Sequence, residues 1–463
     1  MNISNILKKI FIIIVSFSLI LLIGCGKNEK GTEGLEYWEI KNHYGDILEY
    51  WVLGIGRSTS SDIVIPSTYN GKPVTAIREN AFSNCANIKS VTIPSSIKII
   101  LSSAFSNCVN LESVVISEGV DNLGNYMFRG CNNLKKLDLP STLTSISSCA
   151  FYGCESITDV YYHGTLEDWC NIDFFDEHSN PVAYAESLYL LNENNEFYDA
   201  LELEEVNILE GITQISSYSL RNFVKVKHIT IPSTVEVINK NAFENCRNLQ
   251  TVTIQEGVLK TIEYEVFKDC YSITNIIIPN SVKKIGYNAF ENCINLQSIT
   301  LSNNLTEIKL ETFKGCKSLT DIIIPGSVTN IGKSAFEDCT NLKSITISDG
   351  VLEIKDRAFK NCYNLVDISI PNTVINIGVS VFDSCISLTN LIIPNSVSSI
   401  GDWAFYNCQN LTNIIIPDEV VNMGDYVFTE CKNLTIYCEA EFKPEGWKIN
   451  WNQSNCSVVW GTK

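Results

Sequence analysis

The chain has 463 residues, and its 45% hydrophobic content excludes an intrinsically disordered protein. Acidic residues outnumber basic ones by 52 to 34, and the resulting formal net charge of −18 argues against nucleic-acid binding. The length exceeds that of one ordinary compact core, so we expect two or three domains or a repeat array.

The N-terminus begins with a basic segment and an apolar run from Ile10 to Ile23. The run is short for a membrane-spanning helix and is typical of a signal peptide. It leads into "LLIGC", where a small residue precedes Cys25, and this resembles the lipobox of bacterial lipoproteins. The resemblance implies that residues 1–24 are removed and that Cys25 carries acyl chains. An ordinary signal peptide cut nearby, or an uncleaved anchor, is the alternative.

A unit of about 23 residues then repeats along most of the chain and reads C-x-x-L-x-x-I-x-I-P-x-x-V-x-x-I-G-x-x-A-F-x-x-C. The alternation in L-x-x-I-x-I predicts a short strand with one buried face, and the proline ends that strand. V-x-x-I-G suits a second extended segment, and A-F-x-x-C suits one helical turn. No unit can bury its apolar side alone, whereas stacked units can, so the chain is predicted to form a solenoid.

The unit resembles the leucine-rich repeat of the BspA-type bacterial surface proteins. Asp62 to Phe82 is similar to the family's entry repeat, and Leu434 to Gly461 is similar to its C-terminal cap. The resemblance implies an α/β solenoid, a right-handed stack of strand-rich units with short helical turns and a cap at both ends. It also implies a role in adhesion.

The expected organisation follows from the lipobox, the repeat and the two divergent ends. The predicted segments are a lipoprotein signal peptide at 1–24, a tether at 25–36, an N-terminal cap at 37–65, leucine-rich repeats at 66–154, a divergent acidic block at 155–211, leucine-rich repeats at 212–433 and a C-terminal cap at 434–463.

One cysteine per unit forms a ladder along the array. A zinc site needs four converging ligands, whereas this spacing places the cysteines in a line with parallel side chains. In "SLRNF" a phenylalanine, Phe223, occupies the cysteine position, which indicates an apolar slot that cysteine fills. Disulfides between rungs, and a metal or redox role, remain the alternatives. Outside the ladder, Cys438 and Cys456 flank the predicted cap and are a possible disulfide, whereas we expect Cys149 and Cys170 to be buried.

The divergent block is strongly acidic, with 15 Asp and Glu and no Lys or Arg between residues 155 and 220. A functional interpretation is a cation site or a binding surface for a basic partner. We favour the alternative, a solvated face that discourages stacking between molecules. Thr165 with Asp168 predicts a capping box that begins a short helix, and Ser187 to Leu191 predicts a strand. Several aromatic residues either line a sugar site or, as we favour, pack in the core: Trp169, Phe174, Phe175, Tyr184 and Tyr198.

The sequence gives no support for an enzyme. Its four histidines form no paired zinc pattern, and no serine stands in a glycine-flanked nucleophile motif. We therefore expect no catalytic residue, no metal site and no cofactor.

The predicted strands leave one face free to bind a ligand. In L-x-x-I-x-I the third and fifth positions point away from the core. They form a shallow surface of small polar residues and isoleucines, unless the isoleucines merely reflect strand propensity. The candidate ligand-binding residues are Asn275, Ile277, Ser298, Thr300, Asp321, Ile323, Ser344, Thr346, Asp367, Ser369, Asn390, Ile392, Asn413 and Ile415.

Together these features predict a lipid-anchored protein on the outer face of a bacterial cell membrane. It would bind a host or bacterial surface protein, or a polysaccharide, through the strand face, and would contact the membrane through its N-terminal lipid. We expect a monomer. The alternatives are a structural spacer of the envelope without a specific ligand, and an accessory lipoprotein that presents polysaccharide to enzymes.

Overall fold

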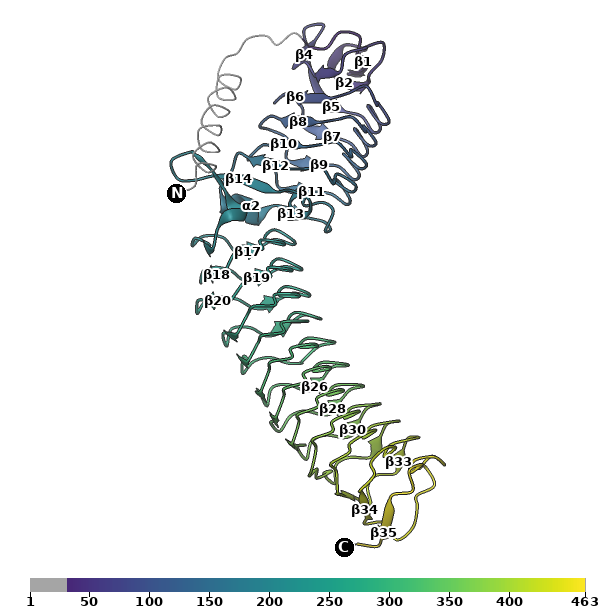
Figure 1. Cartoon of the computed structure of the whole chain (residues 1–463). Coiled ribbons are helices and arrows are strands. Elements are labelled where there is room, and N and C mark those ends of the chain that lie inside the picture. Colours follow the sequence, from purple (N-terminus) through teal and green to yellow (C-terminus); the bar gives the residue numbers. More distant parts are fainter. Residues whose placement is uncertain (1–30, 463) are drawn as a thin grey trace. The chain divides into compact units, whose positions relative to one another are not determined.

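The computed structural model describes residues 31–462, and it divides into two units at Ala200 (Figure 1). The predicted signal peptide and Cys25 lie outside the described residues. Within the described part of the chain, every helix is too short or too polar to cross a membrane.

The first unit is built from three sheets. The N-terminal sheet pairs β1, β2, β5, β4 and β7, which span Glu36–Lys41, Ile47–Gly54, Lys72–Ile77, Thr68–Tyr69 and Ile99–Ile100. The main sheet has the order β15-β14-β12-β10-β8-β6-β3, with bounds Phe197–Asp199, Ser187–Leu191, Asp159–Tyr162, Lys136–Leu139, Ser113–Ile116, Ser90–Ile93 and Asp62–Val64. The short strands β13, β11 and β9 span Asp173–Phe174, Ser145–Ile146 and Asn122–Leu123.

The second unit repeats the same plan. Its longer strands are β16 Glu205–Asn207, β18 His228–Ile231, β20 Thr251–Ile254, β22 Asn275–Ile277, β24 Ser298–Thr300, β25 Asp321–Ile324, β27 Ser344–Ile347, β29 Asp367–Ser369, β32 Asn413–Ile416, β34 Thr435–Cys438 and β35 Ser457–Trp460. Its two-residue strands are β17 Gln214–Ile215, β19 Val237–Ile238, β21 Thr261–Ile262, β23 Lys284–Ile285, β26 Asn330–Ile331, β28 Glu353–Ile354, β30 Asn376–Ile377, β31 Ser399–Ile400 and β33 Asn422–Met423.

Successive repeats pair in parallel with the register that the period predicts. Asp321 pairs with Ser344, and Ser344 pairs with Asp367, so each residue pairs with its equivalent in the next repeat. The two-residue strands form ladders of their own, as in the pairing of Asn330 with Glu353. The chain is therefore the solenoid that the repeat predicts. Most regular units contain both predicted extended segments, and two units reduce one of them to isolated bridges, at Ile308 and at Asn390 and Ile392.

The A-F-x-x-C segments form tight turns rather than helical turns. Asn288 and Asn292 have φ angles of 56° and 60°, in the left-handed region. Hydrogen bonds from Glu291 N to Asn288 O and from Cys293 N to Phe290 O close two overlapping turns of four residues each. A left-handed residue every fourth position prevents a right-handed helix from continuing, so the array is made of strands and turns.

Stacked phenylalanines form the centre of the core. In the second unit the rings run in one column from Phe243 to Phe428, with neighbouring centroids 5.3 to 5.6 Å apart. The last rung replaces this stack with an aromatic cluster in which Trp447 lies 4.8 Å from Trp451 and 5.7 Å from Trp460. Each rung thus contributes one ring, and the final rung contributes three.

The divergent block contains the predicted helix and strand. Helix α2, Leu166–Asn171, begins at Thr165, and the capping box with Asp168 is confirmed. Strand β14 is confirmed at its predicted bounds and forms a hairpin with β15. Two 3-10 helices, η1 at Pro181–Ala183 and η2 at Ala200–Glu202, complete this region.

Candidate functional site

The exposed strand face carries the candidate binding residues. All fourteen predicted positions are exposed, whereas the residues between them are buried, as Ile276 and Ile322 show at 2% and 3% exposure. This alternation is the one that a strand with a single buried face requires. The predicted orientation of these side chains is therefore confirmed.

The isoleucines of this face differ in their neighbours. Ile277 registers with Thr300, and Ile323 registers with Thr346, so each is flanked by a small polar residue. Ile392 instead registers with Ile415. Isolated exposed isoleucines are ordinary on a strand surface, whereas a contiguous apolar row indicates a contact surface.

That row continues beyond the predicted residues. Ile415 registers with Tyr437, and Tyr437 registers with Val459. We call these four residues, Ile392, Ile415, Tyr437 and Val459, the apolar column; their exposed fractions are 77%, 48%, 36% and 41%. The sequence interpretation missed Tyr437 and Val459 because they lie in the predicted cap. The signal was present in the sequence, since Ile415, Tyr437 and Val459 are evenly spaced at an interval slightly shorter than the regular repeat.

The strand positions beside the apolar column are uncharged, whereas carboxylates lie where its strands end. Among the fourteen predicted residues only Asp321 and Asp367 are charged, and neither lies in a rung of the column. The polar residues beside the column are Asn390, Asn413, Thr435 and Ser457, which occupy the third position of their strands. On these strands a ligand of the column would meet amides, hydroxyls and hydrocarbon.

Three carboxylates gather where β32 and β34 end. In the described chain Asp418, Glu419 and Glu439 are the group of potential metal ligands that come within 4.8 Å of one another. The amide of Asp418 donates to Glu439 Oε2 at 3.3 Å, which accounts for part of the clustering. We assign no metal to this group. It lies outside the acidic block for which the sequence raised the cation question.

The cysteine ladder is part of the core. Cys293 donates to the carbonyl oxygen of Phe267 at 3.2 Å, and Cys316 does so to that of Phe290 at the same distance. Burial raises the pKa of both thiols well above the usual value, and it raises that of Cys154 to about 12. Phe223, in the cysteine position, is 1% exposed. The ladder cysteines are therefore core groups. The pKa values of Cys108 and Cys431 are instead lowered, in each case mainly by a hydrogen bond from the neighbouring ladder thiol.

The remaining cysteines of residues 31–462 are free thiols. The predicted disulfide between Cys438 and Cys456 is not formed. Cys438 points into the core from β34, whereas the Cys456 sulfur lies 3.3 Å from the carbonyl oxygen of Cys431 and extends the ladder. Cys170 is buried as expected, but Cys149 is only half-buried.

The five aromatic residues considered for a sugar site differ in burial, and Tyr184 and Tyr198 among them are half-buried. Trp169 and Phe174 are fully buried, whereas Phe175 is 60% exposed. A different aromatic pair lies on the strands of the main sheet, where Tyr161 stacks on Tyr189 with centroids 4.6 Å apart. Tyr189 is only 9% exposed, so this pair offers little ring surface to a ligand.

His163 forms an ion pair beside that stack. Its Nε2 lies 2.9 Å from Asp138 Oδ1. Burial lowers the pKa of His163, but the hydrogen bond and the charge of Asp138 outweigh burial and leave the pKa raised. The pair is only partly exposed, and it satisfies two polar groups on an otherwise aromatic surface.

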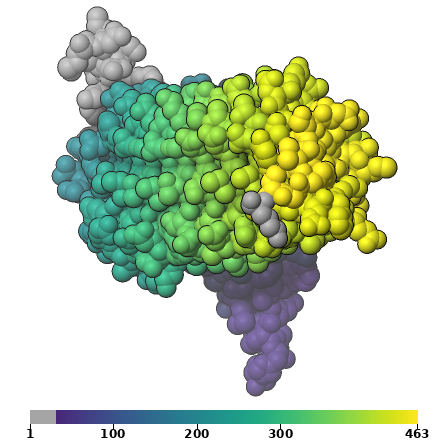
Figure 2. All heavy atoms as spheres, turned by 90° about the horizontal axis from the view of Figure 1, so that it is seen from below, coloured from purple at the N-terminus to yellow at the C-terminus, as the bar shows by residue number. Residues whose placement is uncertain are grey.

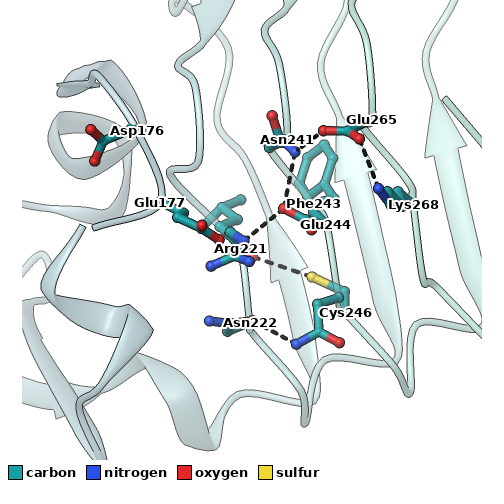
Figure 3. A network of polar contacts seen from close by, with 12 residues as sticks. Asp176, Glu177, Arg221, Asn222, Asn241, Phe243, Glu244, Cys246, Glu265 and Lys268 are labelled. Carbon is teal, nitrogen blue, oxygen red and sulfur yellow. Dashed lines mark hydrogen bonds and ion pairs between the residues drawn. The ribbon is translucent and has the colours of Figure 1, made fainter. Parts of the chain in front are cut away.

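A polar ladder links the turns of the second unit (Figure 3). Asn241 donates to Glu244 at 3.0 Å and to Glu265 at 2.9 Å, and Lys268 donates to Glu265 at 2.7 Å. Arg221 pairs with Glu244 at 2.6 Å. These contacts join one rung to the next, which indicates a structural role and not a binding site.

Comparisons with known proteins support the fold. The family model described as BspA type leucine-rich repeat region matches residues 57–180, 192–319, 260–385 and 352–441. A crystal structure of a leucine-rich repeat protein from Bacteroides ovatus is 24% identical, with a TM-score of 0.53, and the match covers 93% of this chain and 99% of that one. A leucine-rich cell surface protein from Faecalibacterium prausnitzii is 23% identical, with a TM-score of 0.42, over 95% of this chain and 100% of that one. A search of curated proteins finds no match.

Proposed function

Since this chain belongs to the BspA type leucine-rich repeat family, we propose that it is a lipid-anchored cell-surface protein that binds a macromolecular ligand through its exposed strand face. The ligand is a surface protein of a host or neighbouring cell, or a glycan. The proposal makes the protein a non-enzymatic binding scaffold whose N-terminal lipid holds it to the membrane.

The apolar column carries this proposal. Four exposed apolar side chains lie on neighbouring strands at a spacing of about 4.8 Å, so they form one continuous surface. Covering such a surface removes hydrocarbon from water, which contributes roughly 25 cal/mol per Å². A solenoid face of this kind commonly binds an extended partner.

The uncharged strand positions beside the column favour a ligand that is recognised by shape and hydrogen bonds. Asn390 and Asn413 each offer an amide beside the isoleucine of the same strand, so a ligand that covers the column meets donors and acceptors at its border. Interfaces with an apolar centre and a polar rim have this arrangement. Asp418, Glu419 and Glu439 follow the ends of β32 and β34, so a ligand that extends past the column would meet negative charge there.

A glycan and surface-protein array probed with residues 26–463 tests the proposal. We expect a ligand that binds the unmodified chain and loses at least tenfold in affinity with Ile392→Lys plus Ile415→Lys, a loss of about 1.4 kcal/mol. Ile375→Lys is the matched control, because Ile375 is 45% exposed but lies outside the strand face. Unchanged binding by the double variant would contradict the proposed face.

The lipid anchor and the alternative functions have separate tests. Mass spectrometry of the N-terminus of the exported protein should find an acylated Cys25, and an unmodified cysteine there would refute the lipoprotein assignment. A chain that binds no ligand on any array, while its loss alters envelope spacing, would support the structural alternative instead.

A further inference from the structure

The main sheet of the first unit ends on a strand whose outer edge is covered. Thr32 N donates to the carbonyl oxygen of Val64 in β3 at 2.8 Å, and Val64 N donates to Thr32 Oγ1 at 2.7 Å. The inward-facing residues Ile63 and Ile65 are each 1% exposed. This edge is therefore closed by the chain itself.

The last sheet of the second unit ends differently, on β35. This strand pairs with β34 on one side, and no strand pairs with its other side within residues 31–462. Its inward-facing residues Val458 and Trp460 are partly exposed, whereas Ile436 and Cys438, their neighbours on β34, are fully buried. The outer edge of β35 and the end of the core beside it are open, although the sequence predicts a cap here.

The chemistry of this edge favours pairing with another strand. Proteins usually protect exposed edges with charged residues or proline. Strand β1 follows that rule with Glu36, Glu39 and Lys41, but residues 449–462 contain no charge and no proline. Strand β35 itself reads Ser-Val-Val-Trp.

The loop before β35 adds exposed hydrocarbon to the same end of the array. Phe442 is 76% exposed and Ile449 is 88% exposed, the largest fraction among the large apolar side chains of the described chain. Trp447 pairs with Met423, so the loop stacks on the preceding rung as β35 stacks on β34. In Figure 2 the C-terminal segment, coloured yellow, lies at one end of the second unit.

We propose that the open edge of β35 binds β35 of a second copy of this chain in an antiparallel pair. If the core-facing sides of the two strands lie on the same side of the joined sheet, Val459 lies opposite Val459 of the partner subunit. Each Val458 then lies opposite Trp460 of the partner subunit. The pair is isologous, as in most dimers with twofold symmetry. A chain with a net charge of −18 would repel itself across most surfaces, but this edge brings no like charges together. The inference departs from the monomer expected from the sequence. It shares Val459 with the apolar column but does not depend on which ligand that column binds.

Sedimentation velocity of residues 26–463 over a range of concentrations tests the proposal. We expect a reversible monomer–dimer equilibrium that is complete by about 100 µM. In hydrogen–deuterium exchange, the amides of Ser457–Trp460 should slow as the dimer fills, because pairing protects them from solvent. A chain that stays monomeric at about 100 µM would overturn the proposal.

A substitution on β35 distinguishes dimerisation through this strand edge from dimerisation through another surface. Val459→Lys places two lysines opposite each other in the pair, so it should weaken dimerisation at least tenfold. The side chain is already 41% exposed, so the fold should tolerate the change. Ile392→Lys is the matched control on the same strand face and should leave the dimer intact while it weakens ligand binding. A dimer that Val459→Lys leaves unchanged would also overturn the proposal, whatever the ligand result.

Discussion

The Cys293 sulfur lies 3.2 Å from the carbonyl oxygen of Phe267, 26 residues earlier in the chain. The same contact recurs at 3.2 Å from Cys339 to Phe313 and from Cys362 to Phe336. A small side chain with a weak donor thus fills an apolar slot and satisfies a buried carbonyl of the preceding rung. This contact explains why cysteine recurs at this position without a catalytic or metal-binding role.

Thiol accessibility should follow burial. Of the 17 cysteines in the described chain, only Cys85, Cys149 and Cys456 are half-buried. Burial raises the pKa of Cys456 to about 11 and raises that of Cys85, so both react slowly at neutral pH and faster as the pH rises. Titration with a thiol reagent should modify about three groups in the folded chain and all of them in denaturant.

Cys456→Ser provides the control for that titration. It should remove one of the slowly reacting thiols and leave the others unchanged, because Cys456 ends the ladder. Rapid reaction of ladder cysteines in the folded chain would contradict the assignment of the ladder to the core.

Truncation of one stacked ring should be costly. Phe313 is fully buried, and its ring centroid lies 5.5 Å from that of Phe290 and 5.3 Å from that of Phe336. Phe313→Ala should lower the free energy of unfolding of the second unit by about 3–5 kcal/mol, because it leaves a cavity between two rungs. Chemical denaturation measures this change. Phe175→Ala, at a 60% exposed position, should cost far less, and equal costs would refute the role of the stack.

The polar ladder should make stability depend on pH. Burial raises the pKa of Glu265, but the hydrogen bonds from Lys268 and Asn241 outweigh burial and leave the pKa lowered. A lowered pKa means that the ionised form stabilises the fold above the unfolded-state pKa, and this contribution is lost as the pH falls through the folded-state pKa. Glu265→Gln should therefore cost about 1 kcal/mol at neutral pH and progressively less in acid.

The measurement is the unfolding free energy of both chains between about pH 3 and pH 7. Glu445→Gln is the control, because Glu445 is an exposed glutamate outside the ladder. A difference between the unmodified chain and Glu265→Gln that stays constant across this range would contradict the assignment.

Backbone conformation sets the tolerance of the turn positions. Asn292 has a φ of 60°, and Gly315, its equivalent one repeat later, has a φ of 72°. Asn292→Gly should be nearly neutral apart from the lost hydrogen bond to Asp269, whereas Asn292→Val should cost about 1–3 kcal/mol because β-branched residues disfavour this region. Thermal unfolding of the two variants compares them, and equal midpoints would argue against backbone strain.

The period of the sequence predicted most of the fold, because it fixes both the strands and their register. The prolines after the strands and the Phe223 substitution were enough to place the core. The turns were predicted as helical because the left-handed positions were not recognised, although Asn84, Asn107 and Gly130 mark them with residues that tolerate this conformation.

The candidate site was predicted only in part. Alternation along each strand identified the exposed positions, but the apolar column depends on which rungs are neighbours and on the shorter repeat interval of the last rungs. The lack of charge and proline in residues 449–462 is visible in the sequence, but it does not identify the open edge of β35, because an unpaired strand edge is defined by what lies beside it. Pairing and burial in three dimensions were needed to find it.

The cluster of Trp447, Trp451 and Trp460 has a consequence for how the array assembles. Because neighbouring rungs present the same phenylalanine, cysteine and isoleucine contacts, a chain that skips one rung during folding would still satisfy most of its core. The three tryptophans fit only on the last rung and have no equivalent elsewhere in the second unit. An arrangement in which one rung has been skipped therefore differs in energy from the native one. The end of the array thus determines the alignment of the repeats before it.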